Sequence, residues 1–354
     1  MRYNSGMINI VQQSRQWMPA KLLMVLLLMT ATASHVAQAR PELGPPSIKL
    51  RSNIANVVVA TLAGETDEGR MAFDKVSDLH NEAPQRIVID GAEHWRDQLM
   101  VGKTYVLGFI SWQRQRHPKV LKPRPGGPVL MNLPGASPAI YQDHPGVRRL
   151  LSWPLDEAQY SPEAMLPVIM SGLDSGDWQL QEFFLTELVT REPLHAHLTP
   201  EQRQRVAAMA ADASVSPEAR QLLLDLGDFL GEALTAQQRL GIARELIASQ
   251  PLIQDPASDY PSLVRTALFT LEQQGDPTDV PVLSRWLRCE HTGLVEAALD
   301  AMQALDVVQL PGIISRQLDD TLISQPRRQA LQSYQRRVAA ILRQRQNEES
   351  GREG

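Results

Sequence analysis

The chain has 354 residues, of which 43% are hydrophobic and 21% charged, a composition typical of a soluble globular protein with room for two domains. Its formal net charge of −5 excludes a general nucleic-acid binder, which needs a basic contact face, so no nucleic acid is expected among its partners. The single cysteine, Cys289, excludes an intramolecular disulfide, and the fold must be stabilised by packing.

The first 39 residues have the pattern of a secretory signal peptide. Lys21 precedes the apolar run LLMVLLLMTATA, and Ala37-Gln38-Ala39 follows as a cleavage site. The run is shorter than the roughly 20 apolar residues of a membrane span. We therefore expect a periplasmic or secreted protein cleaved near Ala39, with no integral membrane segment. A retained amphipathic anchor is the alternative, and translation could start at Met1, Met7 or Met18.

Residues 40–155 are predicted to form a small β-barrel. Residues 40–46 are expected to be an extended lead-in because they are rich in proline. Gly108, within one predicted strand, indicates a bulge or close packing. Short strands with one small helix between the third and the fourth are typical of an OB-type barrel. The predicted strands are Ala55–Leu62, Arg70–Leu79, Arg86–Asp90, Thr104–Trp112, Pro128–Leu133 and Val147–Trp153, and the helix is Ala92–Leu99.

The barrel sequence resembles one known branch of OB folds. The order VVVATLAGE, RIVIDG and LMVGKTYVLGF, with Gly102, Tyr105 and Leu107 in the last segment, is similar to netrin-like domains, which include the tissue inhibitors of metalloproteinases. Those inhibitors act through an N-terminal cysteine and are disulfide-bonded, whereas this domain has no cysteine. The resemblance therefore implies a fold, and it does not imply protease inhibition.

A basic segment, QRQRHPKVLKPRPGG at positions 113–127, interrupts the predicted strands. Its prolines and glycines predict an exposed loop. One interpretation is electrostatic contact with an anionic envelope surface, either a polymer or a lipid. The other is a solvated loop that joins two strands. The candidate binding residues are Arg114, Arg116, Lys119, Lys122 and Arg124.

Residues 156–346 change to a helical period, and a disordered tail is expected at 347–354. Recurring start signals, such as Thr199-Pro200-Glu201-Gln202 and Thr235-Ala236-Gln237-Gln238, indicate many short helices. We predict helices near 162–171, 178–190, 200–212, 217–231, 235–249, 260–274, 278–288, 293–305, 309–320 and 326–346.

An internal repeat lies within this helical region. Leu263–Arg288 matches Leu294–Asp319 at a shift of 31 residues, with seven of 26 positions identical. Two helices in each copy resemble HEAT-type repeats, which implies an α-solenoid. The predicted fold is thus α+β and multidomain: a small N-terminal OB-like β-barrel followed by an α-solenoid of HEAT-like helical hairpins. Positions that differ between the copies, above all Phe269 and Trp286, are candidates for partner contact. Alternatively, both aromatics pack against the neighbouring repeat.

The sequence contains no recognisable catalytic motif, so we expect no enzyme activity and no cofactor. His195 and His197 could chelate a metal, but no third ligand has suitable spacing, and no metal site is predicted. Cys289 is expected to be a packed thiol. His80, His94, His117 and His144 lie near turns, where surface or capping roles are expected.

These observations favour an exported, non-enzymatic binding or scaffold protein that uses its helical-repeat surface. Its partner would be an unknown envelope protein or peptide. One alternative is an envelope protein that binds polymer or lipid through the basic loop 113–127. A second is a hydrolase or inhibitor with a site between the two domains, involving His94, His144 or the His195/His197 pair.

Overall fold

The computed structural model describes residues 43–111, 126–133, 138–153, 161–253, 262–305, 308–320 and 322–350. Gly44–Gly354 forms one compact unit. The predicted signal peptide and all five basic residues of the loop 113–127 lie outside the described residues.

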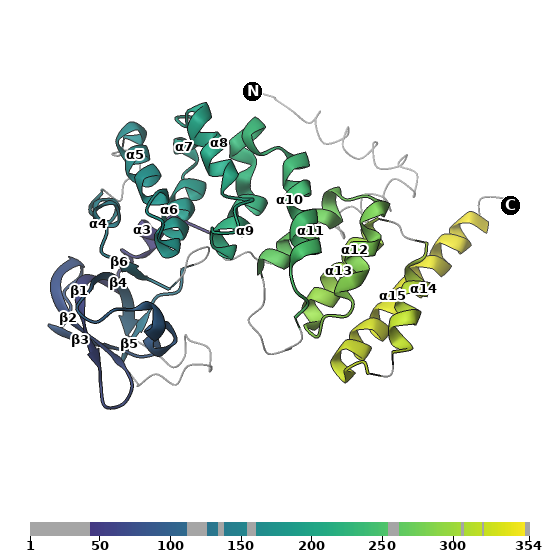
Figure 1. The fold of residues 1–354 in the computed structure, drawn as a ribbon, viewed down its shortest axis with the longest axis horizontal. Coiled ribbons are helices and arrows are strands. Elements are labelled where there is room, and N and C mark those ends of the chain that lie inside the picture. The colour runs from purple at the N-terminus through teal and green to yellow at the C-terminus, as the bar shows by residue number, and fades with distance from the viewer. Residues whose placement is uncertain are drawn as a thin grey trace, which may run out of the picture. The chain divides into compact units, whose positions relative to one another are not determined.

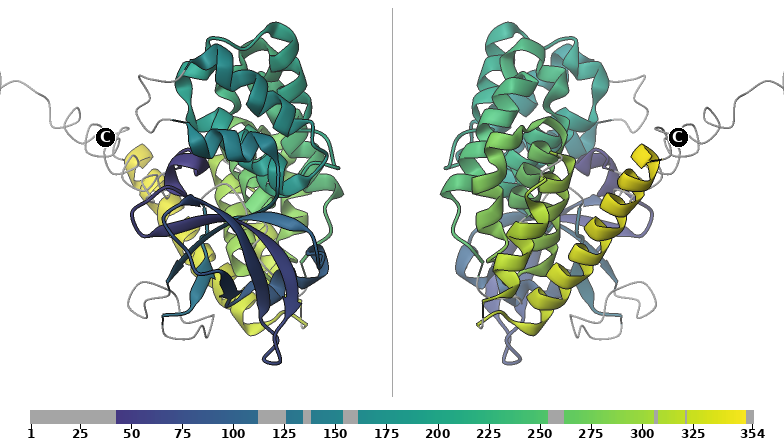
Figure 2. Two further views of the ribbon diagram at one scale, coloured as in Figure 1. Left: turned by 90° about the vertical axis from the view of Figure 1, so that its left-hand side faces the viewer. Right: turned by 90° about the vertical axis from the view of Figure 1, so that its right-hand side faces the viewer.

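The first part of this unit is a nearly closed, barrel-like antiparallel sheet (Figures 1 and 2). Its strands run in the order β3-β2-β1-β4-β5, and β6 also pairs with β4. A parallel bridge from Asp90 to Val129 brings the outer strands β3 and β5 together. The elements are β1 (Ala55–Glu65), β2 (Met71–His80), β3 (Arg86–Ile89), the 3₁₀ helix η2 (Ala92–Gln98), β4 (Thr104–Ser111), β5 (Pro128–Leu130) and β6 (Ile140–Gln142).

The first four predicted strands and the small helix are present, but two short segments differ from prediction. The segment expected as strand Val147–Trp153 is instead helix α4 (Pro145–Ser152). Pro145 occupies the first turn, and the His144 ring accepts the Gly146 N–H, so the start signals override the β-branched residue. Helix α3 (Pro46–Lys49) begins at the last residue of the lead-in, and β6 was not predicted.

Helices follow the sheet, and each predicted helix has a counterpart. The recurring start signals act as expected at Thr199 and Thr235, where both capping boxes form. The last helix continues through residues 347–350, part of the predicted disordered tail. The helices are α5 (Pro162–Leu173), α6 (Trp178–Thr190), α7 (Glu192–His195), α8 (Pro200–Ala208), α9 (Pro217–Leu226), η4 (Gly227–Leu234), α10 (Ala236–Ser249), α11 (Ser262–Gln274), η5 (Pro277–Asp279), α12 (Val280–Trp286), α13 (Thr292–Ala304), α14 (Leu310–Leu318) and α15 (Gln325–Ser350).

The helices form two rows, one packed on the other. In one row α6 packs on α9, α9 on α11, α11 on α13 and α13 on α15. The helices between them pack on this row: α5 on α6, α10 on α11, α12 on α13 and α14 on α15. A continuous hydrophobic core joins the rows from α9 to α15. The internal repeat corresponds to α11–α12 and α13–α14.

A buried polar cluster ties α3, at the start of the barrel, to α6. Glu187 accepts the Ser47 backbone N–H at 2.5 Å and the Arg191 Nε–H at 2.8 Å. Arg191 also donates to the Ser47 hydroxyl at 3.1 Å. Ser47 and Glu187 are fully buried and Arg191 nearly so. Because an unpaired buried charge is costly, this geometry makes α3 and α6 depend on each other.

Aromatic packing reinforces the same junction. The Tyr141 ring of β6 meets Phe183 of α6 edge to face, with ring centroids 4.9 Å apart. Phe184 lies against Gly172 of α5, where a β-carbon would overlap its ring. On the barrel side, Leu50 packs against Gly108 so closely that a β-carbon would overlap it as well. The close packing predicted at Gly108 is confirmed, and the large side chains at this junction require glycine neighbours.

We expect Glu187→Gln to destabilise the protein by about 3–5 kcal/mol, because it removes the charge that pairs with buried Arg191. Urea unfolding followed by circular dichroism measures the loss. Glu192→Gln, at an exposed acid a few residues away, is the matched control and should change stability by less than about 0.5 kcal/mol. Equal stabilities for the two variants would refute the role given to Glu187.

A second pair of variants tests the aromatic packing. Gly172→Ala should cost about 1–3 kcal/mol because the added methyl group overlaps the Phe184 ring. Gly241→Ala lies at an exposed position of α10 with open space around it, and it should be neutral or stabilising by up to about 1 kcal/mol. Thermal unfolding measures both, and a Gly172→Ala protein as stable as the parent would contradict the packing described.

Candidate functional site

Most residues of helix α11 are buried, and its exposed residues are Arg265, Phe269, Gln273 and Gln274. Val264, Leu268 and Leu271 are buried in the core, while Arg265 and Phe269 are exposed and Glu272 is half-buried. The spacing from 265 to 269 to 272 places these three residues on one helix face. Phe269 is 36% exposed, a large aromatic ring on an otherwise polar strip. We define Arg265, Phe269 and Glu272 as the α11 strip.

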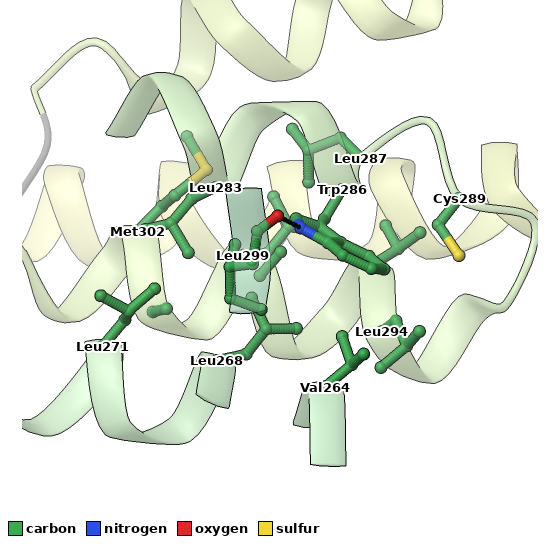
Figure 3. Close-up of a cluster of buried hydrophobic side chains, with 14 of the residues drawn as sticks. Val264, Leu268, Leu271, Leu283, Trp286, Leu287, Cys289, Leu294, Leu299 and Met302 are labelled. Carbon is green, nitrogen blue, oxygen red and sulfur yellow. Dashed lines mark hydrogen bonds between the residues drawn. The ribbon is translucent and has the colours of Figure 1, made fainter. Parts of the chain in front are cut away.

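Trp286, the other aromatic proposed for partner contact, is fully buried, so that interpretation is wrong for this residue (Figure 3). Its indole lies among core leucines and donates its Nε1–H to the Ile247 carbonyl at 3.0 Å. The adjacent Arg285 donates to the carbonyls of Ala248 and Gln250 at the end of α10. Together they satisfy carbonyls that the helix end leaves free. Trp286 thus packs against the end of α10.

A polar network lies beside the α11 strip, on α13 and α15. The Asp300 Oδ1 atom and the Gln303 Oε1 atom lie 3.0 Å and 2.7 Å from the Tyr334 hydroxyl. Arg337 forms an ion pair with Asp300, and its guanidinium lies over the Tyr334 ring at 4.1 Å from the centroid. Burial first, then the Asp300 charge, raises the pKa of Tyr334. This hydroxyl therefore stays protonated and acts as a hydrogen-bond donor.

Glu272 faces the network from α11. Burial is the main cause of a raised pKa for Glu272, the Asp300 charge raises it further, and Arg337 opposes the shift. The Glu272 carboxylate forms no hydrogen bond with the residues that the structure describes. The sequence comparison pointed to Phe269, but it did not single out Glu272. The comparison could have identified Glu272, because this residue aligns with a different residue, Gln303, in the second copy.

The two candidate metal ligands point to different partners. The His195 ring stacks on Phe229 and lies 2.9 Å from the Leu188 carbonyl oxygen, and burial lowers its pKa. His197 lies 3.3 Å from a Glu163 oxygen. No group of three or more potential metal ligands occurs within the described residues.

The remaining candidates for chemistry have structural partners. Cys289 is buried with its thiol against the Ile253 carbonyl, and burial raises its pKa, which disfavours the reactive thiolate. His144 caps α4, as expected for a histidine near a turn. The His80 ring lies 3.1 Å from the Ser52 carbonyl oxygen.

Among the described residues, no helix is long and apolar enough to cross a membrane. Comparisons with protein-family models, with curated proteins and with solved structures gave no match.

Burial predicts a large effect on stability at Trp286 and a small one at Phe269. Trp286→Phe should cost about 1–3 kcal/mol, because it removes a buried hydrogen bond and part of a filled volume. Phe269→Ser, on the α11 strip, should change stability by less than about 1 kcal/mol. Urea unfolding of both variants tests this, and a larger loss for Phe269→Ser would mean that its ring is a core residue.

Proposed function

We propose that this chain is an exported, non-enzymatic binding or scaffold protein that holds a partner protein or peptide on the α11 strip. The observation that carries the proposal is the exposed Phe269 ring beside half-buried Glu272, on a helix most of whose residues are buried. Large aromatic side chains are common anchors of protein interfaces. The export step rests on the signal-peptide pattern of residues 1–39.

The two rows of helices support a HEAT-like solenoid as the scaffold. Each helix of one row packs on the next, as expected when repeats contact only their neighbours. The outer side of α15 carries Gln332, Ser333 and Arg336, all exposed, as a terminal repeat requires for solubility. Such arrays present extended surfaces to other proteins, which fits a binding role.

The strand arrangement supports an OB-type barrel as the first domain. The order β3-β2-β1-β4-β5, the near closure between β3 and β5, and the helix between β3 and β4 fit the predicted barrel of five or six short strands. In this proposal the barrel is held to the scaffold by α3 and gives the protein a second contact surface.

Site-specific photocrosslinking tests the binding role. A benzophenone amino acid in place of Phe269 should form a discrete adduct with an envelope protein in living cells, because this ring lies in the proposed interface. The control places the same group at Val76, a 61% exposed apolar residue of the barrel sheet. An adduct pattern identical at both positions, or none at 269, would remove the α11 strip as the binding surface.

A further inference from the structure

The charges around Glu272 are unbalanced. Two carboxylates, Glu272 and Asp300, are near enough for one to raise the pKa of the other, and Arg337 is the cation that opposes them. The Arg337 guanidinium is already engaged by Asp300, Gln303 and the Tyr334 ring. Asp300 is thus paired within the protein, while a second cation would stabilise the ionised form of the half-buried Glu272 carboxyl.

The repeat shows that this imbalance belongs to one copy. Phe269 and Glu272 align with Asp300 and Gln303. In the second copy both positions are occupied by contacts from the next helix, through Tyr334 and Arg337. In the first copy the ring is exposed and the carboxylate makes no hydrogen bond within the described part of the chain. The α11 strip therefore presents an aromatic ring and an acid at the positions that α15 covers one repeat later.

We propose that the partner places a basic side chain, arginine or lysine, on the α11 strip, with its charge beside Glu272 and its stem against Phe269. This inference rests on the proposed function and names the chemistry of the partner segment. The ring of a phenylalanine attracts a guanidinium or ammonium group, and the carboxylate supplies a charge-assisted hydrogen bond. Glu272 repels an acidic segment. A wholly apolar segment would bury the Glu272 carboxylate without a compensating partner.

Short peptides provide a direct test on the full chain. Fluorescein-labelled peptides of the form Gly-X-Leu-X-Gly carry arginine, lysine, citrulline or glutamate at X, and fluorescence anisotropy measures binding. Citrulline matches the shape of arginine without its charge. The arginine and lysine peptides should bind at least about tenfold more tightly than the citrulline peptide, and the glutamate peptide should bind least. Equal affinity for arginine and citrulline would overturn the inference.

Variants locate the contact. Glu272→Gln should weaken arginine-peptide binding by about tenfold, and Phe269→Ala should weaken it as well. Glu232→Gln removes one exposed acid from η4 and is the control for net charge. Equal losses for Glu272→Gln and Glu232→Gln would reduce the effect to general electrostatics and overturn the inference. Circular dichroism confirms that each variant is folded.

The pH dependence gives an independent readout. A bound cation favours ionised Glu272, so affinity should be complete above its raised pKa and should fall as pH decreases through it. Asp300 of α13 and Arg337 of α15 act on the same carboxylate. Glu272→Gln should therefore lose most of the pH dependence. An unchanged pH profile in that variant would reject the role of Glu272.

The outcomes separate this inference from the proposed function. An adduct at position 269 without selective peptide binding leaves the α11 strip as a binding surface and overturns the basic side chain. Selective peptide binding that depends on Glu272 supports the inference on the isolated protein, whether or not the cellular partner is captured. The absence of both adduct and peptide binding rejects the two together.

Discussion

The buried contact between Glu187, Ser47 and Arg191 is the constraint on which the junction of sheet and helices depends. A carboxylate with no solvent exposure must receive hydrogen bonds from the protein, and here one comes from a backbone 140 residues earlier in the chain. The contact holds α3 on α6. Leu50, which follows α3 directly, in turn packs against Gly108 in β4. A few buried residues thus connect two architectures that each have their own core.

Helix α6 transmits this arrangement to the rest of the chain. It packs on α5 through the Gly172–Phe184 contact and on α9 at the start of the long row. From α9 onward the helices share one apolar core. Within this row most residues of α11 are buried. A large apolar residue among its exposed ones is therefore more informative than a similar residue on a terminal helix.

Much of the fold could be predicted because its signals are local. Strand composition identified the first four strands, and capping motifs such as Thr199 with Gln202 identified helix starts. The failures were short elements. At α4, the local start signals of His144 and Pro145 override residues that resemble a strand, and β6 depends on pairing with β4 across about 35 residues of sequence. The Glu187 cluster joins segments far apart in the chain, and nothing in either segment alone indicates it.

The candidate site shows the same division between local and distant information. Comparing the two repeat copies selected positions that differ, and such a comparison finds both surface residues and residues with a special packing role. Phe269 belongs to the first group, and Trp286 belongs to the second because the end of α10 supplies a carbonyl for its indole. Only the packing distinguishes them. It also identifies Glu272, whose counterpart Gln303 is engaged by the next helix, whereas the Glu272 carboxylate makes no hydrogen bond among the described residues. A position that is covered in one copy and exposed in the other presents different chemistry to solvent, and here that chemistry is an aromatic ring beside a half-buried acid.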